Sequence, residues 1–335
     1  MKKRGKGLSA IGYSTGLYQG ADPSQAQVSL RMDGTFNLLV GSVDMGQGCK
    51  TALTQIAAEE LGVPYEAITF TNDSTEDGAY CAGSYASRVT FMTGNAVIRA
   101  CSDLKKKIMI FASSMVGIKP EQLEVVDNKI VAKNNPEVKP VSMAEIGAAS
   151  TSGGEFLVGY GAYTPGGPYP IDPVTGEQPF VAAAAFATCV VEVEVDTETG
   201  VVEVLKATHV YDIGKAINPL LCKGQINGGA AMGIGMALSE DIHPYWPSVN
   251  FPVDSLGDYV VLTAADMPPD DKHAIVQVPH PDGPFGAKGF SEMSANAPIP
   301  AITAAIHDAI GVWITQFPIT PEMILKALES KQAEG

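Results

Sequence analysis

Glu292 stands at the end of a glycine-rich loop that begins at Gly283 and leads into an apolar stretch. A carboxylate that such a loop delivers into a closed site can act as a general base. Most glutamates are instead solvated surface charges, which is the alternative for this one. The loop context, and not the residue type, therefore makes Glu292 the candidate for proton transfer.

A second glycine-rich segment, GSVDMGQG over residues 41–48, lies between an expected strand and an expected helix start. Gly46 and Gly48 would let the backbone approach a ligand closely, and the free N–H groups of a helix N-terminus suit a phosphate or a pterin. The Gln47 amide both donates and accepts hydrogen bonds, so it could read the edge of a heterocycle. The alternative is a purely structural turn, because glycine-rich strand-to-helix turns are common.

Small hydroxyl residues precede another helix start, in the segment GSYASR over residues 83–88. Ser84 and Ser87 together with Arg88 would form an anion cradle at such a helix start. Serine is also favoured as a helix N-cap, so an ordinary capping segment is the alternative. A hydrolase that uses one of these serines as its nucleophile is disfavoured, since the sequence has no G-x-S-x-G elbow.

Five glycines lie within one expected helix, which opens at Asn218-Pro219 and extends to about Ser239. Each glycine costs a helix interior about 1 kcal/mol relative to alanine, so some contact must offset the cost. Close backbone contact with another helix or with a cofactor is the simplest explanation. Repeated small residues also occur in membrane helices, but Lys223, Gln225 and Glu240 disfavour that interpretation here.

The composition is that of a globular, acidic protein. Hydrophobic residues make up 45% and charged residues 18% of the 335, and the formal net charge is −15. So acidic a surface would repel a nucleic acid, and we expect no such partner. The longest apolar run, residues 180–191, is too short to span a bilayer, and the N-terminus lacks the apolar region of a signal peptide. We therefore expect a cytoplasmic protein without a membrane partner.

The cysteines and histidines, five of each, show no spacing typical of a metal site. The cysteines are odd in number and scattered, which argues against a disulfide framework and against an iron–sulfur cluster on this chain. The histidines form no H-E-x-x-H or similar pattern. We expect no metal ion that is ligated by side chains of this chain alone.

The hydrophobic pattern predicts an α+β fold with two subdomains, mixed sheets and covering helices. The boundary is placed near residue 150, where a stretch rich in Gly, Pro, Ser and Thr begins, so that residues 1–150 and 151–335 form the two subdomains. The basic run at residues 2–4 is expected to be frayed, and residues 150–178 to be an irregular connection. The predicted elements are hairpins over 26–41, 119–140 and 186–210, a strand over 68–71, and helices over 51–61, 89–115, 218–239 and 300–310.

Taken together and in this order, these segments resemble the second half of the molybdenum-binding subunit of the xanthine dehydrogenase and aldehyde oxidase superfamily. The matching stretches are GSVDMGQG followed by TALTQIAAEELG, then ASRVTFMTGNAV, then INPLLCKGQINGG, and finally GPFGAKGFSE followed by PAITAAIHDAIG. Residues 114–180 match least well. Whole family subunits begin with another half, so the chain resembles a split subunit, similar to the medium molybdopterin subunit of nicotinate dehydrogenase.

The resemblance implies roles for particular residues. Glu292 falls on the family's catalytic glutamate, the general base of a metal-assisted hydroxylation in which water supplies the oxygen. Ser291 departs from the family pattern, which usually has glycine directly before that glutamate. The molybdenum would be held by the pterin dithiolene, so no metal ligand is expected from the chain. The residues expected to bind the cofactor are Gly46, Gln47, Gly48, Ser84, Ala86, Ser87, Arg88, Gln225, Lys288, Gly289, Phe290 and Ser291.

The resemblance also implies a cofactor and partners. The cofactor is molybdopterin with molybdenum, in the cytosine dinucleotide form, and electrons would leave through 2Fe-2S clusters and FAD. The partners are a large molybdopterin subunit, an iron–sulfur subunit and an FAD subunit, besides a small-molecule substrate. The likeness to the split subunit favours an N-heteroaromatic substrate, such as a purine or nicotinate-like ring. The alternatives are an aldehyde or an aromatic acyl-CoA substrate, or a non-catalytic subunit that only scaffolds the cofactor.

Overall fold

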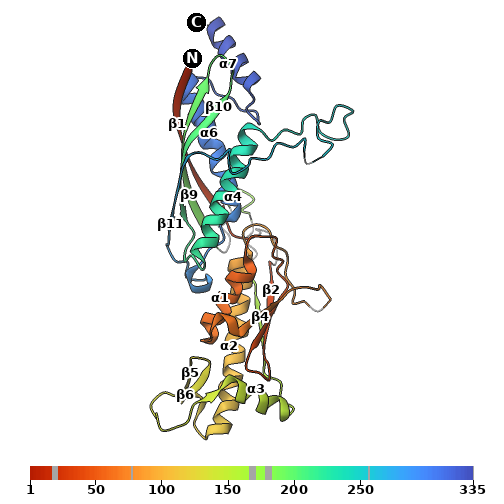
Figure 1. Ribbon diagram of the computed structural model, residues 1–335, viewed down its shortest axis with the longest axis vertical. Coiled ribbons are helices and arrows are strands. Elements are labelled where there is room, and N and C mark those ends of the chain that lie inside the picture. Colours follow the sequence, from red (N-terminus) through yellow and green to blue (C-terminus); the bar gives the residue numbers. More distant parts are fainter. Residues whose placement is uncertain (17–21, 77, 166–170, 178–182, 256, 335) are drawn as a thin grey trace. The chain divides into compact units, whose positions relative to one another are not determined.

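The fold combines mixed β-sheets with helices, as the sequence predicted (Figure 1). The computed structural model describes residues 1–16, 22–76, 78–165, 171–177, 183–255 and 257–334. Its contacts divide the chain into two compact units. Unit 1 comprises Met1–Tyr13, Ala185–Val278 and Phe290–Gly335, and unit 2 comprises Ser14–Ala184 and Pro279–Gly289. The predicted cofactor-binding subdomains, residues 1–150 and 151–335, stay a prediction. The two compact units are defined by contacts between residues, and such contacts do not show which residues bind a cofactor.

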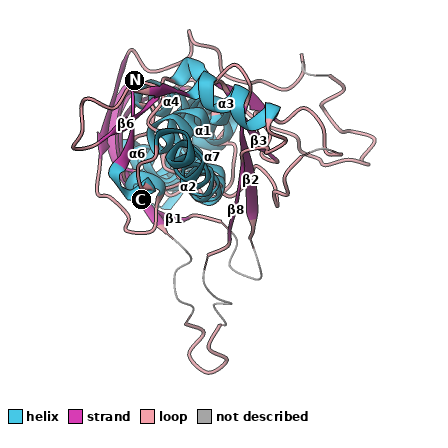
Figure 2. Cartoon of the chain, turned by 90° about the horizontal axis from the view of Figure 1, so that it is seen from below, coloured by secondary structure: helices cyan, strands magenta, loops and turns pink. Residues whose placement is uncertain are grey.

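Unit 2 contains a four-stranded sheet in the order β4-β3-β2-β8. β2 pairs antiparallel with both β3 and β8, which lie alongside it in Figure 2, and β3 pairs parallel with β4. The predicted hairpins over 26–41 and 119–140, the strand over 68–71 and the helices over 51–61 and 89–115 are confirmed. The elements are β2 (Ser24–Leu30), β3 (Phe36–Val40), α1 (Cys49–Leu61), η1 (Tyr65–Ala67), β4 (Ile68–Thr71), α2 (Val89–Val116), η2 (Pro120–Gln122), β5 (Leu123–Val126), β6 (Lys129–Ala132), β7 (Val141–Ser142), α3 (Met143–Ser152), β8 (Val158–Tyr163) and η3 (Pro284–Gly286).

The period-two alternation of apolar residues explains the β2–β3 hairpin. Val28 and Leu38 are directly paired, and both are fully buried. Helix α2 packs against β2 and β8, and helix α1 packs against α2. Gly62 ends α1 in the left-handed conformation at φ 74° and returns its N–H to the Ala58 carbonyl. The sheet and its helices thus fix the loops at residues 41–48 and 83–88, which lead into α1 and α2.

Strand β8 lies inside the segment that was predicted to be irregular, so that prediction is wrong for residues 158–163. Gly159 is buried and Gly161 is partly buried in this strand. A strand is recognised in the sequence by apolar side chains at its buried positions, and glycine has none. A Cβ on Gly159 would lie 2.2 Å from the Ala100 carbonyl oxygen, and one on Gly161 would lie 2.0 Å from that of Ala96. These glycines therefore let the backbone of α2 rest directly on the strand.

Unit 1 contains the sheet β1-β9-β10-β11, in which β9 and β10 are antiparallel and β10 and β11 are parallel. The predicted hairpin over 186–210 and the helices over 218–239 and 300–310 are confirmed. The Asn218 side chain caps the first of these helices by accepting from the Leu221 N–H at 3.0 Å. The elements are β1 (Lys2–Ser14), β9 (Ala184–Asp196), β10 (Val202–Asp212), α4 (Pro219–Leu238), β11 (Asp270–Val276), α5 (Ser291–Asn296), α6 (Pro298–Ile310) and α7 (Pro321–Glu334).

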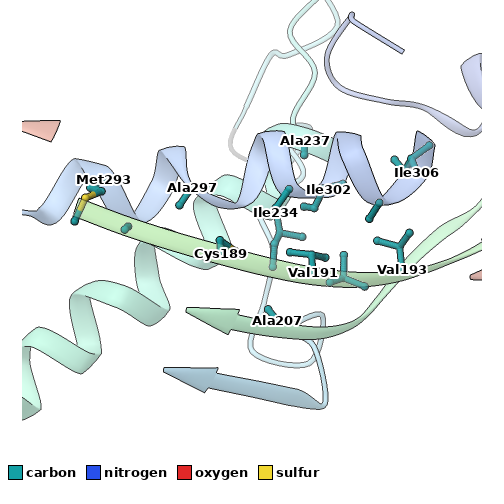
Figure 3. Packing of buried hydrophobic residues seen from close by; sticks show 14 of the residues in the cluster. Cys189, Val191, Val193, Ala207, Ile234, Ala237, Met293, Ala297, Ile302 and Ile306 are labelled. Carbon is teal, nitrogen blue, oxygen red and sulfur yellow. The ribbon is translucent and has the colours of Figure 1, made fainter. Parts of the chain in front are cut away.

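The core of unit 1 lies between the inner face of this sheet and the helices α4 and α6 (Figure 3). Every second residue of β9, including Cys189, Val191 and Val193, is fully buried there. Ile234 of α4 and Ile302 of α6 pack against these residues in the same cluster. The alternation is typical of a strand with one buried face, and it holds β9 and β10 in register.

Strand β1 begins at Lys2, so the prediction of a frayed basic terminus is wrong. Lys2 and Arg4 form ion pairs with Glu194 of β9 at 2.7 and 3.0 Å. On the buried face of the strand, a Cβ on Gly5 would lie 2.1 Å from the Ala305 carbonyl oxygen. Gly7 contacts the Ala301 carbonyl, one turn earlier in helix α6. Glycines of β1 thus pack against the α6 backbone, as the glycines of β8 pack against the α2 backbone.

Among the residues described, no helix has the length and apolarity that crossing a bilayer requires. All five cysteines are unpaired.

Candidate functional site

The loop at residues 41–48 in unit 2 is held together by its own amides. Gln47 accepts a hydrogen bond from the Met45 N–H at 2.6 Å through Oε1 and donates to the Val43 carbonyl at 2.8 Å through Nε2. The Ser84 hydroxyl donates to the same carbonyl at 2.9 Å and accepts from the Val43 N–H at 3.1 Å. The structure therefore brings two predicted residues, Gln47 and Ser84, to one backbone position.

Asp44 organises the backbone of this loop. Its carboxylate accepts from the N–H groups of Gly46, Gly48 and Lys50 at 3.0, 3.2 and 2.9 Å. Partial burial alone would raise the pKa of Asp44, but these N–H donors outweigh it and hold the pKa below its ordinary value. The sequence analysis did not single out Asp44, although an acidic residue just before a helix start is a signal that could have found it.

Gly46 is the open point of the loop. It adopts φ 106°, and among the described residues no heavy atom beyond its own chain neighbours lies within 4 Å of the position that a Cβ would take. Gly48 also has a positive φ, 82°, directly before helix α1. This backbone favours glycine at both positions, and Gly46 is exposed.

Arg88 is fully buried, and other parts of unit 2 already use its guanidinium. Nε forms an ion pair with Asp22 at 2.5 Å, and Nη1 donates to the Gly83 carbonyl at 2.8 Å. Nη2 donates to the Ser24 hydroxyl at 2.8 Å and to the carbonyls of Asp22 and Pro23 at 3.1 and 3.0 Å. The sequence analysis assigned Arg88 to an anion cradle, whereas here it anchors the loop at residues 83–88.

The backbone of this loop is strained where the cradle was predicted. Ala86 and Ser87 adopt left-handed conformations with φ 49° and 50°, which residues with a Cβ rarely do. The Ala86 carbonyl accepts from the Gly16 N–H at 2.9 Å. A Cβ on Gly289 would lie 1.5 Å from the Ser87 carbonyl oxygen, so the loop around the buried Lys288 packs directly on the strained turn.

Several residues that sequence reasoning missed hold these loops in place. Thr15 Oγ1 accepts from the Gly289 N–H at 3.2 Å. Cys81 lies 3.0 Å from Nη1 of Arg88 and 3.2 Å from the Ser42 hydroxyl. Burial would raise the pKa of the Cys81 thiol, but hydrogen bonds from its neighbours and the nearby guanidinium lower it overall. The contacts of Thr15 with Gly289 and of Cys81 with Ser42 join residues 274 and 39 positions apart, so no local sequence pattern predicts them.

In unit 1, Gln225 and Ser291 are brought together. The Ser291 hydroxyl donates to Oε1 of Gln225 at 2.8 Å, and the Ser294 hydroxyl donates to the Gln225 carbonyl at 3.1 Å. Glu292 lies in the first turn of α5, where a carboxylate is favoured, and is partly buried. Phe290, directly before this helix, is largely buried and packs near Tyr211 with ring centroids 6.4 Å apart.

Four of the five glycines of α4 form two rows along the helix. A Cβ on Gly229 would lie 1.7 Å from the Ser294 hydroxyl oxygen, and one on Gly233 would lie 2.4 Å from the Ala295 carbonyl oxygen. These two glycines therefore allow helix α5 to pack against the backbone of α4, which is the close helix contact that the sequence predicted. At Gly224 and Gly228, no described atom beyond the adjacent backbone of α4 lies within 4 Å of the Cβ position. No internal contact explains those two.

The predicted residues therefore fall into two groups, each within one unit. Gly46 in unit 2, and separately Gly224 and Gly228 in unit 1, present exposed backbone that a flat or anionic group could approach. Within the described part of the chain, no group of three or more His, Cys, Asp or Glu side chains is placed to hold a metal ion. Unit 2 contributes Gly46, Gln47, Gly48, Ser84, Ala86, Ser87, Arg88, Lys288 and Gly289, and unit 1 contributes Gln225, Phe290, Ser291 and Glu292.

Comparison with known proteins identifies the family of this chain. Residues 1–268 match the family model described as a molybdopterin cofactor-binding domain. The chain is 33% identical over 326 residues to "Probable hypoxanthine oxidase XdhD" of Escherichia coli (strain K12), covering 97% of this chain and 32% of that protein. It is 34% identical over 338 residues to "Aldehyde oxidoreductase" of Megalodesulfovibrio gigas, covering 98% and 33%.

A relative named as a complex subunit and a solved structure extend the comparison. The chain is 32% identical over 341 residues to "6-hydroxypseudooxynicotine dehydrogenase complex subunit gamma" of Paenarthrobacter nicotinovorans, covering 97% of this chain and 38% of the relative. The crystal structure of quinoline 2-oxidoreductase from Pseudomonas putida 86 superposes with a TM-score of 0.84 at 27% identity, covering 98% of this chain and 42% of that one. The chain thus spans about a third of the length of the curated relatives it matches.

Proposed function

The chain belongs to the family of molybdopterin cofactor-binding domains, and we propose that it is the cofactor-binding catalytic subunit of a multi-subunit molybdenum hydroxylase. Its substrate would be an N-heteroaromatic ring, purine or nicotinate-like, hydroxylated with oxygen from water. The observation that carries this proposal is the similarity over nearly the whole chain to proteins named for hypoxanthine and quinoline, which are both N-heteroaromatic.

The cofactor proposed is molybdopterin, in its cytosine dinucleotide form. Bound there, it would supply a redox-active molybdenum held by the pterin dithiolene. In unit 2, the open backbone at Gly46 and the turn at Ala86 and Ser87 would bind it through main-chain groups. In unit 1, Gln225 would contribute an amide, with Gly224 and Gly228 allowing close approach.

Glu292 is proposed as the general base. It would accept, at a carboxylate oxygen, the proton lost by the water that supplies the oxygen atom. It lies in the first turn of α5, directly after the loop that ends at Phe290. Ser291 and Ser294 tie this turn to α4 through Gln225, which would keep the carboxylate from drifting.

Partner chains complete the proposal. A large molybdopterin subunit would bind beside this chain, as the resemblance to the split subunit implies. An iron–sulfur subunit with 2Fe-2S clusters and an FAD subunit would carry the electrons away. The relative named subunit gamma of a dehydrogenase complex supports such an assembly. We place the complex in the cytoplasm, and fractionation of the source cells tests that location.

The proposal is tested on the complex purified through an affinity tag on this chain. We expect bound molybdenum by elemental analysis and cytidine monophosphate after acid release of the nucleotide. With a dye acceptor, hypoxanthine or nicotinate should be oxidised faster than an aldehyde or an aromatic acyl-CoA. A complex without molybdenum overturns the function, and preferential turnover of the aldehyde or the thioester overturns the substrate class.

A further inference from the structure

Ser291 occupies the position where the family resemblance leads one to expect glycine. A glycine could not make the contact seen here, in which the serine hydroxyl donates to Oε1 of Gln225 at 2.8 Å. The Ser294 hydroxyl bonds only backbone oxygens, those of Gln225 and Ser291, at 3.1 and 2.6 Å. Of these two hydroxyls, the one on Ser291 therefore acts on the amide.

The surface of α4 explains why this amide matters. Residues four apart share one row of a helix surface, so Gln225 lies in line with Gly229 and Gly233, which α5 covers. The neighbouring row holds Gly224 and Gly228, where no described atom beyond the adjacent backbone of α4 itself comes within 4 Å of a Cβ position. Gln225 thus lies at the border between the covered row and the open row.

We infer that Ser291 is a positioning residue that sets the orientation of the Gln225 amide. A glutamine amide can turn over and exchange its oxygen for its NH₂ group at little intrinsic cost. A hydroxyl that donates to Oε1 fixes the oxygen toward α5 and leaves Nε2, with its two N–H donors, for an acceptor above the open row. This inference rests on the proposed function, in which that acceptor belongs to the molybdopterin cofactor.

The test is a double-mutant cycle that reads cofactor retention, not turnover. Ser291→Ala should speed the loss of molybdenum from the purified complex in mild denaturant about fivefold, the effect of one hydrogen bond. Ser291→Thr keeps a hydroxyl and should restore the slow loss. In a Gln225→Ala background, Ser291→Ala should change the rate no further, because the hydroxyl acts through the amide.

Gln225→Glu sharpens the cycle. It keeps an acceptor for the Ser291 hydroxyl but removes both N–H donors, so it should lose the cofactor as fast as Gln225→Ala. The matched control is Ser239→Ala at the far end of α4, where the hydroxyl bonds the carbonyls of Gly235 and Val260. Additive effects of Ser291→Ala and Gln225→Ala overturn the inference while the proposed function stands. A wild-type complex without molybdenum overturns both.

Discussion

The candidate residues of unit 2 and those of unit 1 use their polar side chains differently. In unit 2, Arg88, Gln47 and Ser84 all bond to backbone of their own unit, and the open positions are those of main chain, above all Gly46. In unit 1, the Ser291 hydroxyl holds the amide of Gln225 beside an open strip of α4. These contacts therefore hold backbone in unit 2, whereas in unit 1 the Ser291 hydroxyl holds a side chain.

Substitution of Glu292 should have the largest effect. Glu292→Gln removes the proposed base without changing the size of the side chain, so kcat should fall about 10²–10⁴-fold while molybdenum content per complex stays unchanged. The measurement pairs steady-state turnover with elemental analysis. Glu322→Gln is the matched control, since Glu322 is an exposed acid in the first turn of α7, and it should turn over normally. Normal turnover by Glu292→Gln would make unit 1 a scaffold only.

Arg88 tests the structural side of the comparison. Arg88→Ala removes the guanidinium from a fully buried ion pair with Asp22, so unfolding of the chain in urea should become about 3–5 kcal/mol easier. Arg99→Ala, which removes an exposed arginine bonded to the Ala162 carbonyl, should cost far less. If Arg88→Ala unfolded like wild type and lost only the cofactor, the guanidinium would be a ligand and not an anchor.

The two glycine rows of α4 give opposite predictions. Gly229→Ala places a methyl group against the Ser294 hydroxyl, so it should destabilise the cofactor-free chain by about 1–3 kcal/mol. Gly228→Ala meets no described atom beyond the backbone of its own helix and gains helix propensity, so it should stabilise the chain by up to about 1 kcal/mol while cofactor retention falls. Urea unfolding and molybdenum content measure the two effects. Equal effects of both substitutions on stability would remove the distinction between the rows.

The same glycines show how far the sequence could lead. Alternating apolar residues predicted β2, β3, β9 and β10, because every second residue of a strand with one buried face is apolar. In β1 and β8 the buried positions are partly glycines, which contact helix backbones and have no side chain to reveal the period. Two residues along a strand span about 6.6 Å, and four residues along a helix span about 6 Å. Because these spacings are similar, Gly5 contacts Ala305 and Gly7 contacts Ala301, one helical turn away. Hydrophobic patterning cannot detect such an interface.

The candidate site shows a similar limit. The loops around Gln47, Ser84 and Gly289 were found because glycines and small hydroxyl residues cluster locally before helices. The internal partners of Arg88 were not found, since Asp22 and Ser24 are distant in sequence and carry no motif. A residue type that suits an anion is equally suited to a buried ion pair, and only the fold decides which of the two it forms.

Asp44 gives the smallest expected effect and tests how unit 2 shapes its backbone. Its folded pKa is depressed, so its contribution to stability is present above the unfolded value of 3.8 and is lost as the pH falls through the lower folded value. Asp44→Asn should therefore unfold more easily than wild type at pH 6, and the difference should shrink as the pH falls below 3.8. Urea midpoints at several pH values measure this. A gap of constant size across the range would mean that the oxygens of Asp44, and not its charge, hold the N–H groups of the loop.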